Sequence, residues 1–265
     1  MLAEARGFAG KLAFKGHDSA MRPIFLCLIA VAGLAAADLP RPPAKPVAIR
    51  KELLFSDDFQ GAAPSPLWHR VVDTFVIQEG VLLGSQTRVS DQTAPDGRVV
   101  KAHAAVHGLE LPTRDSVVEC RIRMDGATMV DVEFTDRKYT GSHYGHICRA
   151  QVRPTGVTLI DERDGNMRSD IYEMKKDPAK KAKVAQLVAG RQVTYPLKIE
   201  AGRWYDLMVE TAGDEMRVLL DGKAVAYLKS SGIAHATKSK IELGVAGQTG
   251  RFDDIKVWNA APSLK

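Results

Sequence analysis

The chain has 265 residues, a formal net charge of +5 and an isoelectric point near 9.0, and only 6% of its residues are aromatic. Much of the positive charge lies in Lys175–Arg191, where no aromatic residue interleaves with the basic ones. Nucleic-acid binding is therefore not indicated. We interpret this segment as the solvated face of a helix, and docking of an acidic protein partner as its alternative role.

An export signal is predicted near the N-terminus. A short basic start at Met21 precedes an apolar run from Ile24 to Leu34 and the small residues Ala35–Ala37. This is the pattern of a cleavable secretory signal, and the run is too short to span a bilayer. We expect residues 1–37 to be an upstream extension plus signal peptide, cleaved near Ala37, and the mature protein to be secreted or periplasmic.

The mature chain is predicted to be one all-β domain after a short tether. Residues 38–51 contain four prolines and are interpreted as an extended linker. Residues 52–260 alternate short strand patterns with turn residues, which is typical of a sandwich or jelly roll. Asp177–Ala189, with Pro178 in its first turn, predicts one inserted helix. Strands are expected at Thr74–Gln78, Val81–Thr87, Val99–Val106, Ser116–Met124, Thr128–Thr135, His143–Val152, Gly156–Glu162, Gln192–Ile199, Trp204–Thr211, Glu215–Leu220, Ala224–Leu228, Lys240–Ala246 and Arg251–Trp258.

Three central strands are predicted to carry polar side chains on the face away from the core. The period of two places apolar residues inward, and on the third strand it places Tyr144 and His146 inward as well, with His146 expected as a core histidine. If the strands are neighbours, acids and arginines lie side by side, either as cross-strand ion pairs or as a sugar-binding face. The outward set is Glu119, Arg121, Arg123, Met129, Asp131, Glu133, Thr135, Arg149, Gln151 and Arg153.

Both ends of the domain resemble concanavalin A-like, laminin-G-like sandwiches. Leu54–Phe59 and Phe75–Leu82 carry the resemblance at the start, and Gly202–Leu207 and Phe252–Val257 carry it at the end. Their order is similar to the 3-keto-disaccharide hydrolase-like family of exported bacterial proteins. The resemblance implies a jelly-roll fold and a glycan or small glycoside as partner. Val245–Gly250 replaces the family's Leu-Gln-x-His-Gly stretch, so a hydrolase and a non-catalytic carbohydrate-binding or interaction module both stay open.

The hydrolase interpretation assigns catalysis to a polar cluster of Glu119, Asp131, Glu133 and His143. Glycosidic cleavage commonly uses two carboxyl groups, and histidine transfers protons near neutral pH. The strand from Asp131 to Asp136 also resembles the Glu-x-Asp-x-x-Glu strand of laminarinase-type hydrolases. That resemblance implies Asp131 as nucleophile, Glu133 as helper and Asp136 as acid. A solvent-facing strand edge is the alternative.

Substrate contacts are expected from the polar face and from the loop Thr135–Ser142, which we interpret as the lip of a site. The three tryptophans fall in fold-defining stretches and are expected to pack in the core. The candidate substrate-binding residues are Arg121, Tyr139, Tyr144, Arg149 and Gln151.

A structural calcium ion is a further hypothesis. Asp57 and Asp58 near the start and Asp253 near the end are predicted on adjoining strands, and Ca²⁺ prefers carboxylate oxygens. Turn hydrogen bonds by these aspartates are the alternative. Cys120 and Cys148 are expected as buried thiols, since an intervening strand would hold them about 10 Å apart, too far for a disulfide.

Overall fold

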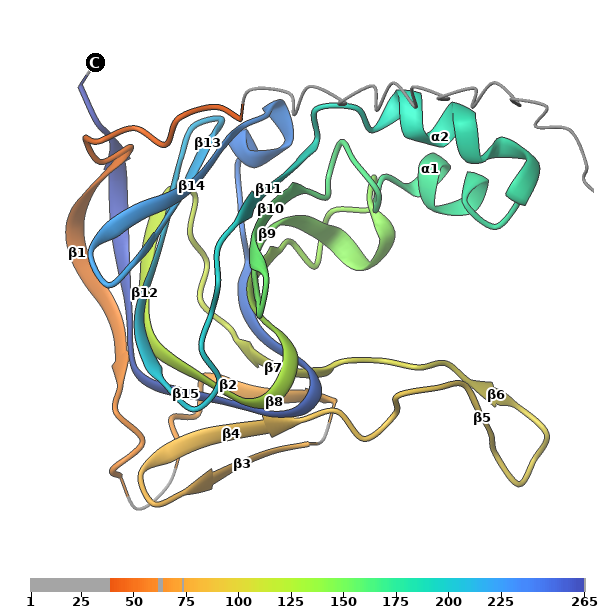
Figure 1. Ribbon diagram of the computed structural model, residues 1–265, viewed down its shortest axis with the longest axis horizontal. Coiled ribbons are helices and arrows are strands. Elements are labelled where there is room, and N and C mark those ends of the chain that lie inside the picture. The colour runs from red at the N-terminus through yellow and green to blue at the C-terminus, as the bar shows by residue number, and fades with distance from the viewer. Residues whose placement is uncertain (1–38, 62–63, 73, 265) are drawn as a thin grey trace, which may run out of the picture. The chain divides into compact units, whose positions relative to one another are not determined.

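The computed structural model describes residues 39–61, 64–72 and 74–264, so the predicted signal segment lies outside the described residues. The described part is an antiparallel β structure with two short α-helices (Figure 1). The strands are β1 Ala48–Asp57, β2 Trp68–Val72, β3 Phe75–Gln78, β4 Val81–Ser85, β5 Gln92–Thr93, β6 Val99–Val100, β7 Ala105–Leu109, β8 Ser116–Thr135, β9 His146–Arg153, β10 Gly156–Asp161, β11 Gln192–Pro196, β12 Trp204–Ala212, β13 Glu215–Leu220, β14 Lys223–Lys229 and β15 Lys240–Pro262.

Two long strands, β8 and β15, link the two layers of the sandwich. Each was predicted as two strands, but they pair with each other along both halves. Their register shifts around Gly126 and Gly247, whose positive φ angles of 87° and 84° suit glycine. Each strand therefore bends instead of ending (Figure 1).

The bend gives β8 different neighbours in its two halves. Its first half pairs with β12, in a layer ordered β14–β13–β12–β8–β15–β1. Its second half pairs with β9, in a layer ordered β11–β10–β9–β8–β15–β7–β2. The predicted inward residues lie between these layers and are buried, which confirms that part of the pattern: Val118, Cys120, Ile122, Met124, Val130, Val132, Phe134, Cys148, Ala150 and Val152.

The tryptophans do not share one environment. Trp68 is buried, and its Nε1 donates to Asp57 Oδ2 at 2.8 Å. Trp204 and Trp258 are half-buried on the outer face of the first layer, where arginine side chains cover them. The prediction of core packing is therefore confirmed for Trp68 and wrong for Trp204, whereas Trp258 packs against a second, small buried cluster of Ala48, Val117 and Ala212.

The segment expected to be a free tether contacts the sandwich instead. Tyr195 Oη donates to the carbonyl of Pro40 at 2.5 Å. Arg217 Nη1 donates to the carbonyls of Pro43 and Lys45 at 2.8 and 2.6 Å. Val47 is buried, and β1 begins at the next residue. Prolines favour an extended chain, and here the backbone carbonyls of that extended chain accept hydrogen bonds from side chains of the domain.

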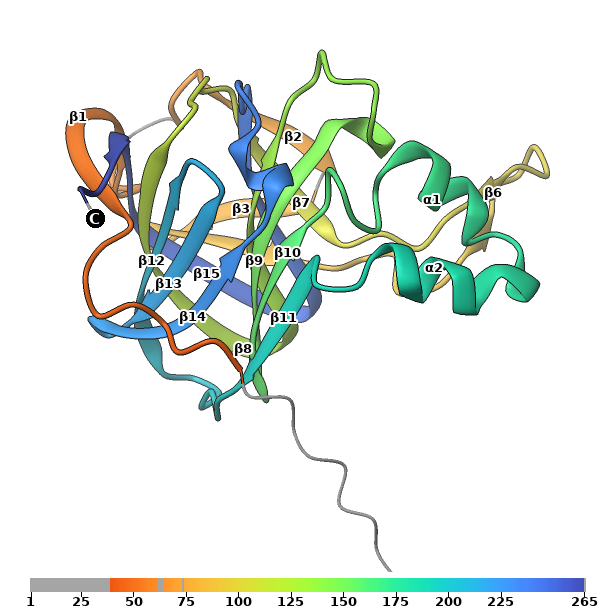
Figure 2. The same ribbon diagram turned by 90° about the horizontal axis from the view of Figure 1, so that it is seen from above.

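The inserted helix is shorter than predicted and has a companion. α1 spans Ser169–Met174, a 3₁₀ turn covers Pro178–Lys180, and α2 spans Lys181–Leu187. Asp177 caps the turn through a hydrogen bond from the Ala179 amide. The insertion extends to the same side as the β5–β6 arm (Figures 1 and 2).

Both cysteines of the described chain are free and buried, as expected. Burial raises the pKa of each thiol to about 12. With Cys27 replaced by serine, we expect no reaction of the folded protein with a disulfide reagent at pH 8, because thiolate is the reactive species. Both thiols should react in denaturant. A fast reaction of either thiol before unfolding would contradict the buried placement.

Candidate functional site

An open cleft of about 950 Å³ lies over the outer face of the second layer. β8, β9 and β15 form its floor, and the loop from Arg137 to Gly145 forms one wall. Arg88 and His103 line it from the segment that carries the β5–β6 arm. The volume is that of a site for a small ligand.

Three acidic side chains lie on the floor of this cleft. Asp131 and Glu133 are two residues apart on β8, so both side chains lie on the same face. Glu242 of β15 lies directly opposite Glu133 in the register. All three are only 3–5% exposed. Like charges directly opposite in a sheet are unfavourable, so neighbouring cations must compensate them.

Arg149 of β9 is the main compensating cation. Its Nη2 lies 2.9 Å from Glu133 Oε1, its Nη1 lies 3.4 Å from Asp131 Oδ2, and its Nε lies 2.8 Å from Glu162 Oε1. Burial lowers the pKa of the guanidinium, but these three carboxylates raise it well above its ordinary value. Lys240, on β15, forms an ion pair with Glu242.

His146 lies beside the acids and not in the core, so that prediction was wrong. A register shift in the β8–β9 pair places His146 opposite Thr135, and Ile147 takes the core position. The Nδ1 atom of His146 contacts Glu133 Oε1 within hydrogen-bonding distance. One extra residue at the start of β9 therefore moves the imidazole to the polar face.

The floor residues have shifted pKa values with identifiable causes. Burial raises the pKa of Asp131 to about 6, against the opposing effect of Arg149. Burial acts upward on Glu133 too, but Arg149 and His146 outweigh it, so the pKa of Glu133 falls below its usual value. Burial disfavours the charged imidazole, yet Glu133 outweighs it and raises the pKa of His146.

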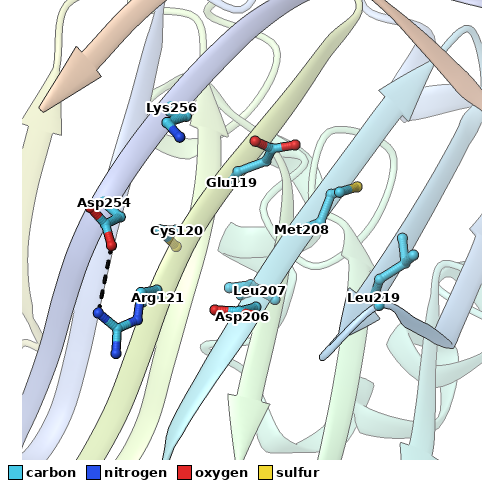
Figure 3. A pocket seen from close by; sticks show the side chains of 10 residues that line it. Glu119, Cys120, Arg121, Asp206, Leu207, Met208, Leu219, Asp254 and Lys256 are labelled. Atoms are coloured by element: carbon cyan, nitrogen blue, oxygen red, sulfur yellow. Dashed lines mark ion pairs between the residues drawn. The ribbon is translucent and has the colours of Figure 1, made fainter. Parts of the chain in front are cut away.

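Glu119 and Arg121 do not belong to this cleft. They lie on the first half of β8, on the outer face of the other layer, in a separate pocket of about 330 Å³ (Figure 3). Glu119 forms an ion pair with Arg50. Arg121 pairs with Asp253 at 3.4 Å and with Asp254 at 3.5 Å. The expected single polar face is thus two faces, because β8 bends between them.

His143 was also misplaced. It lies in a 3₁₀ turn, His143–Gly145, and its ring stacks on Tyr172 of α1 with centroids 3.6 Å apart. The cleft contains His146 instead. Asp136, expected as the acid, accepts a hydrogen bond from the Lys138 amide at 3.0 Å, and its Oδ2 lies 3.0 Å from His235 Nε2. Neither His143 nor Asp136 lines the cleft.

The predicted substrate-binding residues divide in the same way. Arg149 lies on the floor, Tyr139 lines the cleft from the predicted lip, and Tyr144 lines it from the following turn, His143–Gly145. Tyr144 is 84% exposed, so its predicted inward placement was wrong, because it lies in a turn before β9 begins. Gln151 is buried next to the floor and accepts a hydrogen bond from Arg153 Nη2 at 3.0 Å, so it does not reach the cleft.

The calcium hypothesis correctly anticipated that the aspartates lie on adjoining strands. Asp57 pairs with Ile255 in the β1–β15 register. However, both oxygens of Asp57 are used, accepting from the Phe59 amide and from Trp68. Asp58 accepts from the Gln60 amide, and Asp253 pairs with Arg121. These contacts favour the alternative, in which the aspartates form turn hydrogen bonds. A calcium ion at this position stays an untested prediction.

Lys240 and Glu242 were missed as site residues. Their strand alternates them with Ile241, Leu243 and Val245, so the period of two could have assigned both to an outward face. What the pattern could not show is that this strand lies next to β8. Gly244 completes the series and also lines the cleft.

Gly244 leaves room for the carboxylate of Asp131. A Cβ atom at this position would lie 2.1 Å from Asp131 Oδ1. We expect Gly244→Ala to lower the free energy of unfolding by about 1–3 kcal/mol through overpacking. In an Asp131→Ala background, chemical denaturation should show a smaller cost. If Gly244→Ala lowers the free energy of unfolding equally in both backgrounds, the loss arises from the backbone at residue 244 and not from overpacking against Asp131.

No protein-family model and no curated protein matches the sequence, but solved structures match the fold. The laminarinase catalytic domain from Thermotoga maritima has 12% identity and a TM-score of 0.53, over 81% of this chain and 99% of that one. The endo-beta-1,3-glucanase from Pyrococcus furiosus has 11% identity and a TM-score of 0.51, over 83% and 100%. An endo-β-galactosidase from Clostridium perfringens has 12% identity and a TM-score of 0.52, over 82% and 65%.

The chain has a concanavalin A-like jelly-roll fold. The fold class predicted from the sequence is confirmed. At this level of identity the likeness establishes the architecture alone, since one fold supports many functions. Within the described residues, the structure has no helix that is both long and apolar enough to cross a membrane.

Proposed function

We propose that this protein is an exported glycan-handling domain that binds a glycan or small glycoside in the cleft over β8, β9 and β15. The observation that carries the proposal is the cleft itself. Its floor holds three buried carboxyl groups, and its rim presents the exposed ring of Tyr144. Carboxylates hydrogen-bond sugar hydroxyls, and an exposed aromatic ring offers a face on which a sugar ring stacks. Glycan-active enzymes among the fold neighbours support this use of the fold.

The proposed activity is hydrolysis of a glycosidic bond. Such cleavage commonly uses two carboxyl groups that flank the bond. Asp131, Glu133 and Glu242 supply such groups from two adjacent strands, and His146 and Arg149 fix the position of Glu133. The family resemblance suggests 3-keto-glycosides as the substrate class.

A non-catalytic binding module is the second candidate. It is favoured because the floor carboxylates are already paired: Arg149 contacts Asp131 and Glu133, and Lys240 contacts Glu242. In this case the acids would orient the sugar, and bound glycan would remain intact.

A glycan array combined with a 3-keto-glycoside hydrolysis assay tests the proposal. We expect binding in the cleft, and we expect Tyr144→Ala to weaken it by about tenfold or more, equivalent to ~1.4 kcal/mol. Trp204→Ala, an aromatic change on the other layer, is the matched control. Binding that is lost in Trp204→Ala and kept in Tyr144→Ala would refute the cleft as the site. Binding without turnover would select the second candidate.

A further inference from the structure

The structure assigns a divalent metal site to Glu133, His146 and Glu242 on the floor of the cleft. One potential ligand atom from each residue lies within 4.8 Å of the others. The three come from three adjacent strands: β8, the start of β9, and β15. Among the described residues, no other group of three histidine, cysteine or acidic side chains meets this distance limit.

The charge balance of the floor favours a bound cation. Four buried carboxyl groups meet here, from Asp131, Glu133, Glu162 and Glu242. Arg149 and Lys240 are the permanent cations in contact with them. A histidine that ligates a metal is neutral, so four carboxylates against these two cations leave a deficit of two positive charges, which a divalent ion would supply. Buried charges require such compensation.

A separate observation comes from Thr135. It lies on the same face of β8 as Glu133, and its register partners are His146 on β9 and Lys240 on β15. The residue is only 2% exposed, yet its hydroxyl has no hydrogen-bond partner in the described part of the chain. Buried hydroxyls are nearly always paired. A water or hydroxide on the metal would provide the missing partner.

The donor set indicates the class of metal. One imidazole and two carboxylates suit Zn²⁺, Mn²⁺ or Co²⁺, whereas Ca²⁺ and Mg²⁺ prefer oxygen ligands alone. Three protein ligands leave coordination positions open to the cleft, as in catalytic sites. The site differs in place and in metal class from the calcium position considered at Asp57, Asp58 and Asp253.

Metal binding can be measured without any glycan. The full chain, with tags removed and dialysed against a chelator, is titrated calorimetrically with Zn²⁺, Mn²⁺, Co²⁺ and Ca²⁺. We expect one transition-metal ion per chain and a visible absorption band for bound Co²⁺. His146→Gln and Glu242→Gln should each weaken binding by at least about 100-fold, since changes to groups behind the ligands already cost up to that much.

His143→Gln and Glu119→Gln are the matched controls, because His143 stacks on Tyr172 and Glu119 lies on the other layer. Both should bind metal like the parent chain. Circular dichroism establishes that each variant is folded, and the Co²⁺ band reports on the ligands directly. Absence of binding up to about 1 mM metal, or full binding by His146→Gln, overturns the assignment. Glycan binding by the chelated protein would leave the proposed function standing even then.

Discussion

Arg217→Met is expected to lower the free energy of unfolding by about 3–5 kcal/mol, because it leaves Glu210 as an unpaired buried charge. The two side chains are each 3% exposed and form a bidentate pair, with Nη2–Oε1 at 2.8 Å and Nε–Oε2 at 3.0 Å. Arg217 also donates to three carbonyls of residues 43–45. Urea denaturation of the parent chain and the variant measures the difference.

The same substitution should release the segment that precedes β1. The Val47 amide donates to Glu210 Oε2 at 2.9 Å, so its hydrogen exchange should speed up in the variant. Arg203→Met is the control, because Arg203 pairs with Asp221 at the surface, where ion pairs are worth about 0–1 kcal/mol. A loss in Arg217→Met no larger than in this control would contradict the anchoring role.

If the chain catalyses the proposed hydrolysis with Asp131 as a proton-transferring group, Asp131→Asn is expected to lower its rate by about 10²–10⁴-fold, the usual contribution of such a side chain. Asp131 lies on the cleft floor, and an amide of the same size cannot give or take a proton there. Steady-state kinetics on a glycoside that the parent chain cleaves provide the measurement. The KM should change much less than kcat, because the shape of the cleft is kept.

Glu119→Gln is the control for this result, since Glu119 has the same chemistry but pairs with Arg50 on the other layer. Its rate should match that of the parent chain. Metal binding should persist in Asp131→Asn, because Asp131 is not one of the three assigned ligands. A variant that keeps full activity would remove Asp131 from the chemistry and leave Glu133 and Glu242 as the carboxyl groups of the cleft floor that could carry it.

Local pattern was enough to predict most of the fold. Alternation with a period of two assigned the buried sets on β8 and β9, which the structure confirms. It also assigned Asp131 and Glu133 to one polar face. It failed at His146, since parity counting assumes a regular strand and a single register shift reverses it. The long strands β8 and β15 were each predicted as two strands, because a bend at a glycine and the end of a strand look alike in the sequence.

The sequence by itself determined the all-β class, the inward and outward faces, and the buried state of both cysteines, because these follow from backbone geometry and local hydrophobicity. Only the tertiary structure decided which polar residues meet. It separated Glu119 from Asp131 by bending β8, brought Glu242 opposite Glu133, and replaced His143 by His146. Such pairings depend on strand order and register between distant segments, which no local pattern encodes.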